Sequence, residues 1–119
     1  RGVIGHSMDT FMMWEKEIDW SDIPLPRPFS KNEITLEDFV DHIDHVCQLA
    51  GNSFHSAIGG DTDGQGGMVG APKEIDTVLD YQKLTELLKN RGYTNSDIEN
   101  IMYKNWQRFF ENNLPVIEK

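Results

Sequence analysis

The chain has 119 residues, of which 38% are hydrophobic and 26% are charged, proportions typical of one soluble globular domain rather than of a disordered segment. Its 20 acidic residues outnumber the 11 basic ones and give a formal net charge of −9, which disfavours binding to nucleic acids. No apolar run approaches the roughly 20 residues that span a bilayer, so we expect no transmembrane segment in this chain, and a single cysteine excludes an internal disulfide framework.

The first predicted element is a short buried strand over residues 2–5, with the sequence GVIG. A long loop is expected next, over residues 7–29, because three prolines at alternate positions near its end exclude a helix. Its large apolar side chains predict that the loop is anchored to the body of the protein, with a lining or lid role at a site as the alternative. These side chains are Phe11, Met12, Met13, Trp14, Trp20 and Phe29.

A helix is expected between Thr35 and Gly51. Thr35 can cap the first turn, with Asp38 placed as in a capping box, and Gly51 can supply a left-handed end. Apolar residues at three- and four-residue steps define one buried face. They are Phe39, Val40, Ile43, Val46, Cys47 and Ala50. Because Cys47 falls on this face, we expect an inert core thiol rather than a nucleophile.

A second strand is predicted within SFHSAIGG, residues 53–60, followed by a glycine-rich loop. A helix containing Tyr81 and three leucines should end at Gly92, and a final helix should run from Thr94 to near Asn113. The buried stripe of this final helix would comprise Ile98, Ile101, Met102, Trp106, Phe109 and Phe110. Strands alternating with helices indicate a parallel α/β protein, and because two strands do not make a stable sheet, the chain is expected to be part of a larger domain.

Four histidines are candidates for metal binding. His42 and His45 lie in the sequence DHIDH, but they fall outside the apolar face and lack the glutamate of an HExxH site. A polar helix face is therefore favoured over ligation. His6 and His55 belong to the predicted strands or their ends and are expected to pack or to form hydrogen bonds. We assign no metal ligand to this chain.

The run AIGGDTDGQGG, residues 57–67, places two aspartates directly after the second predicted strand. A calcium loop that starts at Asp61 would need a glutamate at its twelfth position, which is Pro72. Two interpretations remain open. The aspartates can be part of a strand-terminating turn, or one can be a catalytic carboxylate, because sites of parallel α/β proteins lie at the carboxyl ends of strands.

The sequences DHIDHVCQLAGNSFHSAIGGDTDG and YQKLTELLKNRGYTNSDIENIMYKNWQRFF together resemble the C-terminal end of the membrane (renal) dipeptidase family, peptidase family M19. The resemblance runs from about Gly2 to Phe110. It implies a (β/α)8 TIM barrel of the metal-dependent hydrolase type, in which residues 1–119 form the C-terminal segment of a single domain, with the last two βα units and a closing helix. It also implies two zinc ions, whose ligands would lie upstream of this chain.

The same resemblance implies zinc-dependent hydrolysis of dipeptides, which can carry a D-residue on the carboxyl side. Asp61 matches the aspartate that ends the last strand of the barrel, so we expect it to act as a proton shuttle, whereas Asp63 is assigned to loop structure. The implied partners are a dipeptide substrate and the remainder of the barrel, and a homodimer is allowed. The compartment, whether cytoplasmic, periplasmic or extracellular, is left open. The alternative is a non-catalytic, helix-rich fragment or interaction module with no activity of its own.

Overall fold

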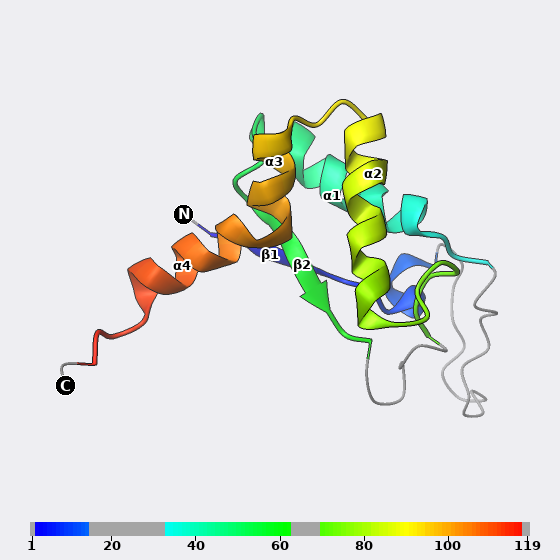
Figure 1. Cartoon of the computed structure of the whole chain (residues 1–119), viewed down its shortest axis with the longest axis horizontal. Coiled ribbons are helices and arrows are strands. Elements are labelled where there is room, and N and C mark those ends of the chain that lie inside the picture. The colour runs from blue at the N-terminus through cyan, green and yellow to red at the C-terminus, as the bar shows by residue number, and fades with distance from the viewer. Residues whose placement is uncertain (1, 15–32, 63–69, 118–119) are drawn as a thin grey trace.

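The computed structural model describes residues 2–14, 33–62 and 70–117. Two strands lie in the middle, helices α1, α2 and α3 gather on one side of them, and α4 points away from the body toward the C-terminus (Figure 1). In chain order the elements are β1 (Ile4–Ser7), η1 (Thr10–Met13), α1 (Leu36–Ala50), β2 (Ser56–Gly60), η3 (Val78–Gln82), α2 (Lys83–Asn90), α3 (Asn95–Glu99), η4 (Asn100–Lys104) and α4 (Asn105–Asn113).

The two strands pair in parallel, which confirms the predicted α/β arrangement. Ile4 lies opposite Ser56 and His6 opposite Ile58, with a shift in register after His6. The prediction of β1 over residues 2–5 was wrong by two residues at each end. The ladder begins where the Ile4 amide donates to the His55 carbonyl at 2.8 Å, and an apolar run of four residues does not reveal that pairing.

The predicted second strand also began too early, at residue 53 instead of Ser56. The preceding residues form a turn, in which the Phe54 amide donates to the Asn52 side chain at 2.9 Å. Asparagine favours such local bonds over extended pairing. The strand then ends at Gly60, as predicted.

Two glycines allow β1, β2 and the last helix to lie unusually close. A Cβ on Gly59 would lie 2.7–2.8 Å from backbone atoms of Gly5 and His6, and a Cβ on Gly5 would lie 2.7 Å from the ring of Trp106. The Trp106 Nε1–H donates to the Ile58 carbonyl at 2.9 Å. This ring therefore joins the C-terminal helical segment to β2.

Helix α1 has the ends that the sequence predicted. The amide of Thr35 donates to the Asp38 carboxylate at 2.7 Å, and the Asp38 amide donates back to the Thr35 hydroxyl at 3.4 Å. Gly51 ends the helix with a φ of 70°. The prediction of a buried Cys47 is confirmed.

The remaining predicted face of α1 is mostly confirmed, and helices α1 to α3 share one core. Phe39, Val40 and Ile43 are fully buried, whereas Val46 is half-buried and Ala50 is exposed. The core consists of Met8, Met13, Ile34, Leu36, Phe39, Val40, Ile43, Cys47, Ala71, Ile75, Leu84, Leu88, Ile98 and Ile101. Because these residues come from the segment after β1, from α1, from the segment before η3, and from α2, α3 and η4, burial of this core ties those segments together.

The start of the predicted long loop is anchored to that core. Met13 is buried, and Trp14 packs against the core from its edge, which confirms the anchoring role for these two side chains. Met12 is 59% exposed. Trp20 and Phe29 lie outside the described residues, and so does most of the loop.

The predicted final helix ends at Asn113 as expected, but a π-helical turn at Asn100–Lys104 interrupts it. The Asn100 side chain donates to the Ser53 hydroxyl at 3.1 Å, and Asn105 Nδ2 donates to the carbonyls of Ser53 and Ser56 at 2.7 and 2.8 Å. These two asparagines are five residues apart. The wider π turn brings such residues closer to one face than an α-helix does, so both can reach the same buried loop.

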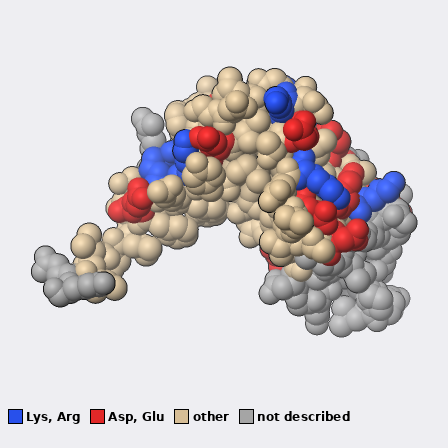
Figure 2. Space-filling view, in the orientation of Figure 1, with Lys and Arg blue, Asp and Glu red and all other residues tan. Residues whose placement is uncertain are grey.

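Charged side chains gather toward α2 and toward α4, and the surface between them carries few charges (Figure 2). Beyond Asn113, Leu114, Val116 and Ile117 are 61–89% exposed. Within the described residues, none of the helices combines the length and the apolar character that a membrane span requires.

Candidate active site

Ser7 and Asp61 lie side by side at the carboxyl ends of the two strands. Ser7 is the last residue of β1, and Asp61 directly follows β2. The Ser7 hydroxyl donates to Asp61 Oδ2 at 3.3 Å. The carboxyl ends of parallel strands meet at one edge of a sheet, which is where α/β proteins place their sites.

The backbone turns abruptly at Asp61. Gly60 has a φ of 80° and Asp61 a φ of 68°, and among the described residues Asp61 is alone among non-glycines in having a positive φ. Aspartate tolerates this left-handed conformation better than most residues, but it remains an unfavourable one. The turn ends β2 and leaves the Asp61 side chain exposed at the edge of the sheet.

Contacts on both sides hold this turn in place. The Met8 amide donates to the Gly60 carbonyl at 2.8 Å, which continues the pairing of the strands up to the turn. On the other side, the hydroxyl groups of Thr62 and Tyr81 are 2.9 Å apart and share a hydrogen bond. The residues before and after Asp61 are therefore each fixed to a different part of the molecule.

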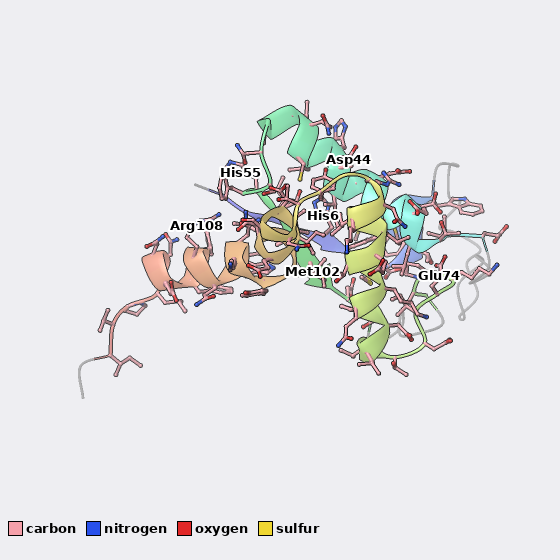
Figure 3. The ribbon with its side chains drawn as sticks, turned by 45° about the horizontal axis from the view of Figure 1, so that its top comes forward. His6, Asp44, His55, Glu74, Met102 and Arg108 are labelled. Atoms are coloured by element: carbon pink, nitrogen blue, oxygen red, sulfur yellow. The ribbon has the colours of Figure 1, made fainter. Side chains whose placement is uncertain are left out.

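The histidines do not converge on this turn. Figure 3 shows His6 in the middle of the molecule, and His55 toward the end of the sheet where Arg108 lies. The His6 Nε2 lies 3.3 Å from the Ser56 hydroxyl, whose own hydrogen is donated to the Ile43 carbonyl, so Nε2 is the protonated nitrogen. Burial, together with the charge of His42, lowers the pKa of His6 to about 4. His6 is thus a neutral packing and hydrogen-bonding residue at pH 7.

The other histidines also have ordinary structural surroundings. His55 Nδ1 donates to the Gly2 carbonyl at 2.8 Å. His42 and His45 lie on the exposed side of α1, beside an open surface cavity of about 440 Å³. The cavity is lined by Met12, Met13, Trp14, Asp38, Asp41, His42 and His45.

The described residues do not form a metal centre. Nowhere in residues 2–14, 33–62 and 70–117 do three or more His, Cys, Asp or Glu side chains cluster in a way that could hold a metal ion. In the cavity beside His42, Asp38 is bonded to Thr35, and Asp41 pairs with Arg91 at 2.6 Å. The carboxylates of the cavity are therefore already used in structural contacts.

Comparison with known proteins identifies the family. The family model for membrane dipeptidase, peptidase family M19, matches residues 2–116. The chain belongs to this family. A curated protein of Klebsiella pneumoniae, named an uncharacterized protein in the pqqA 5′ region, is 28% identical over 81 residues, which cover 68% of this chain and 28% of that protein. The chain thus spans less than a third of the length of this curated relative, and no solved structure matches it significantly.

In this member of the M19 family, the residues that support Asp61 could not be recognised from sequence alone. Ser7, Thr62 and Tyr81 contact the turn, yet Ser7 lies 54 positions before Asp61 and Tyr81 lies 19 positions after Thr62. Parallel strands bring their carboxyl ends together, which is a partial signal for Ser7, but the predicted first strand stopped at residue 5 and left Ser7 in the loop. Asp63 lies outside the described residues.

Proposed function

We propose that the protein containing this chain hydrolyses dipeptides in a zinc-dependent reaction, and that Asp61 is its proton shuttle. Membership of the membrane dipeptidase family supports the reaction. The observation that supports the role of Asp61 is its exposed carboxylate on a left-handed turn at the carboxyl end of β2. An unfavourable backbone conformation held in place on both sides is typical of functional positions.

The chemistry assigned to Asp61 is transfer of one proton. Hydrolysis joins the oxygen of water to the peptide carbonyl carbon and breaks the bond between that carbon and nitrogen. The Asp61 carboxylate would accept a proton from the attacking water and then donate it to the departing nitrogen, which leaves as an amine. The carboxylate is restored at the end of the cycle, and acid–base catalysis of this kind contributes about 100- to 10,000-fold to the rate.

The two zinc ions implied by the family would be held by residues outside this chain. Zinc ligands are His, Cys, Asp and Glu side chains, and the described residues contain no cluster of three of them. We therefore assign no metal ligand among the described residues. Their contribution to the site is the carboxylate of Asp61 and the structure that supports it.

The remainder of a (β/α)8 barrel would complete the sheet. A pair of parallel strands has two open edges, and parallel strands normally occur in larger sheets that are covered on both faces. Ile4 on β1 is 53% exposed, and Figure 2 shows few charges between the ends of the molecule. In such a barrel β1 and β2 would be the last two strands, and the described segment that follows Ser7, residues 8–14, would begin on the active face.

The proposal is tested on the full-length protein. Purified protein is assayed with a panel of dipeptides that includes D-residues at the carboxyl side, before and after removal of metal by a chelator, and after return of zinc. We expect hydrolysis that chelation abolishes and zinc restores. A full-length protein that hydrolyses none of the dipeptides even when zinc is supplied would contradict the proposal and favour the alternative of a non-catalytic interaction module.

The role of Asp61 is tested with Asp61→Asn, because asparagine also tolerates the left-handed conformation and the variant should keep the turn. Its matched control is Glu111→Gln, which neutralises an exposed carboxylate on α4. We expect turnover at least about 100-fold lower for Asp61→Asn, with zinc content unchanged, and no change for the control. Near-normal turnover by Asp61→Asn with zinc retained would refute the assignment.

A further inference from the structure

We propose that Ser7 is a positioning residue for the Asp61 carboxylate, an inference that rests on the function proposed for Asp61. The two side chains come from neighbouring strands and meet at the carboxyl edge of the sheet. Ser7 Oγ lies 3.3 Å from Asp61 Oδ2. The residues are 54 positions apart in the sequence, so only the pairing of the strands brings them together.

The direction of the Ser7 hydroxyl is set by a second contact. The Asp9 amide donates to Ser7 Oγ at 3.1 Å. Because this amide occupies an acceptor position on the oxygen, the hydroxyl hydrogen is left to point elsewhere, and the Asp61 carboxylate is the acceptor within reach. Asp9 is 2% exposed and caps the short helix η1, so the amide that orients Ser7 is itself held in a fixed segment.

The strand pairing is irregular at this point, and the irregularity places Ser7 beside the turn. His6 pairs with Ile58, and continuing that register would pair Ser7 with Gly59. Instead, Ser7 pairs with Gly60, the residue directly before Asp61. Such bulges redirect a side chain and are common beside active sites. Without the shift, Ser7 would lie one residue farther from Asp61.

The consequence for the carboxylate is a restrained orientation. A free aspartate at an exposed turn rotates about two side-chain bonds, whereas the hydrogen bond from Ser7 to Oδ2 restrains both and does not involve Oδ1. Oδ1 is then the oxygen that would exchange the proton. Catalytic geometry is sensitive to displacements of about 1 Å, which can lower turnover about 100-fold, so losing this restraint should slow the reaction without removing it.

Three substitutions of Ser7 separate this role from a general effect on folding. Ser7→Ala removes the donor, Ser7→Cys keeps a side chain of similar shape with a much weaker donor, and Ser7→Thr keeps the hydroxyl on a residue favoured in strands. In the full-length protein we expect kcat to fall about tenfold or more for Ser7→Ala and Ser7→Cys, with KM and zinc content unchanged. Ser7→Thr should restore kcat to near the wild-type value.

A double-mutant cycle shows whether Ser7 acts through Asp61. Ser7→Ala is combined with Asp61→Asn, and we expect no further loss of kcat, because the carboxylate that Ser7 orients is already absent. An unchanged kcat in Ser7→Ala and Ser7→Cys would overturn the proposal, as would an equal loss in both backgrounds. The Asp61→Asn variant alone distinguishes the two levels. If it turns over normally, the proposed role of Asp61 fails, whereas if it loses turnover and Ser7→Ala keeps the wild-type kcat, only the inference about Ser7 fails.

Discussion

Replacing Gly59 by alanine tests whether the close approach of β1 and β2 determines the structure around Asp61. The new Cβ would lie 2.7 Å from the His6 carbonyl oxygen and 2.8 Å from the carbonyl carbon and oxygen of Gly5. All three are backbone atoms of the paired strand, so no side chain can rotate to make room. To restore ordinary contacts of about 3.4 Å, the strands must separate by several tenths of an ångström, against the hydrogen bonds that join them.

This clash should lower the free energy of unfolding. Overpacking a close-packed interior costs about 1–3 kcal/mol. We expect about 3 kcal/mol for Gly59→Ala, because the new Cβ meets backbone atoms and the hydrogen bonds between the strands resist their separation. The matched control is Gly2→Ala, since a Cβ on Gly2 meets nothing within 4 Å. The assay is urea unfolding of the full-length protein, compared between the two variants and wild type. If the free energies of unfolding of Gly59→Ala and Gly2→Ala differ by less than about 0.5 kcal/mol, the two strands do not lie as close together as the structure indicates.

Two further predictions concern Asn105, which is buried, and His6, which is half-buried. Asn105→Ala should lower the free energy of unfolding by about 3 kcal/mol, because the buried carbonyls of Ser53 and Ser56 both lose their donor. The control is Asn113→Ala, on the exposed end of α4, which should lower it by less than about 0.5 kcal/mol. Equal losses in the two variants, measured by urea unfolding, would refute the role of Asn105. The pKa of His6 is lowered to about 4 from 6.5, so the unfolded chain binds more protons between these values. Stability should therefore be flat above pH 6.5 and fall as the pH drops to 4, by clearly less than about 3 kcal/mol, the value of the full shift, because the partly exposed ring is screened by solvent. The free energy of unfolding, measured as a function of pH, should no longer show this fall in His6→Gln and should still show it in His45→Gln. An identical pH dependence in both variants would contradict the assignment of the fall to His6.

Features set by neighbouring residues could be predicted from the sequence. The Thr35 and Thr94 caps each depend on an aspartate three positions later, and both capping boxes are present. The left-handed ends at Gly51 and Gly92 follow from the lack of a side chain. Because these signals are local, they do not depend on the rest of the fold.

Features set by distant partners could not be predicted in the same way. The bounds of β1 depend on its register with β2, and the π turn depends on Ser53, which lies 47 residues before Asn100. The same distinction applies to the candidate site, in which Asp61 depends on a local signal and its contact with Ser7 on a distant one. Asp61 was a candidate because it follows a predicted strand, and the family resemblance singled it out. Its bond to Ser7, by contrast, depends on an irregularity in strand pairing that leaves no mark on either segment alone.

The most direct test of Asp61 as a proton shuttle compares an amide substrate with the matched ester in Asp61→Asn. A departing amine requires a proton, whereas the alkoxide released from an ester is a better leaving group and depends less on one. In the full-length protein with zinc content verified, we predict that Asp61→Asn lowers kcat for the dipeptide at least about tenfold more than for the corresponding depsipeptide. Equal losses on the two substrates, or no loss on either, would contradict the account.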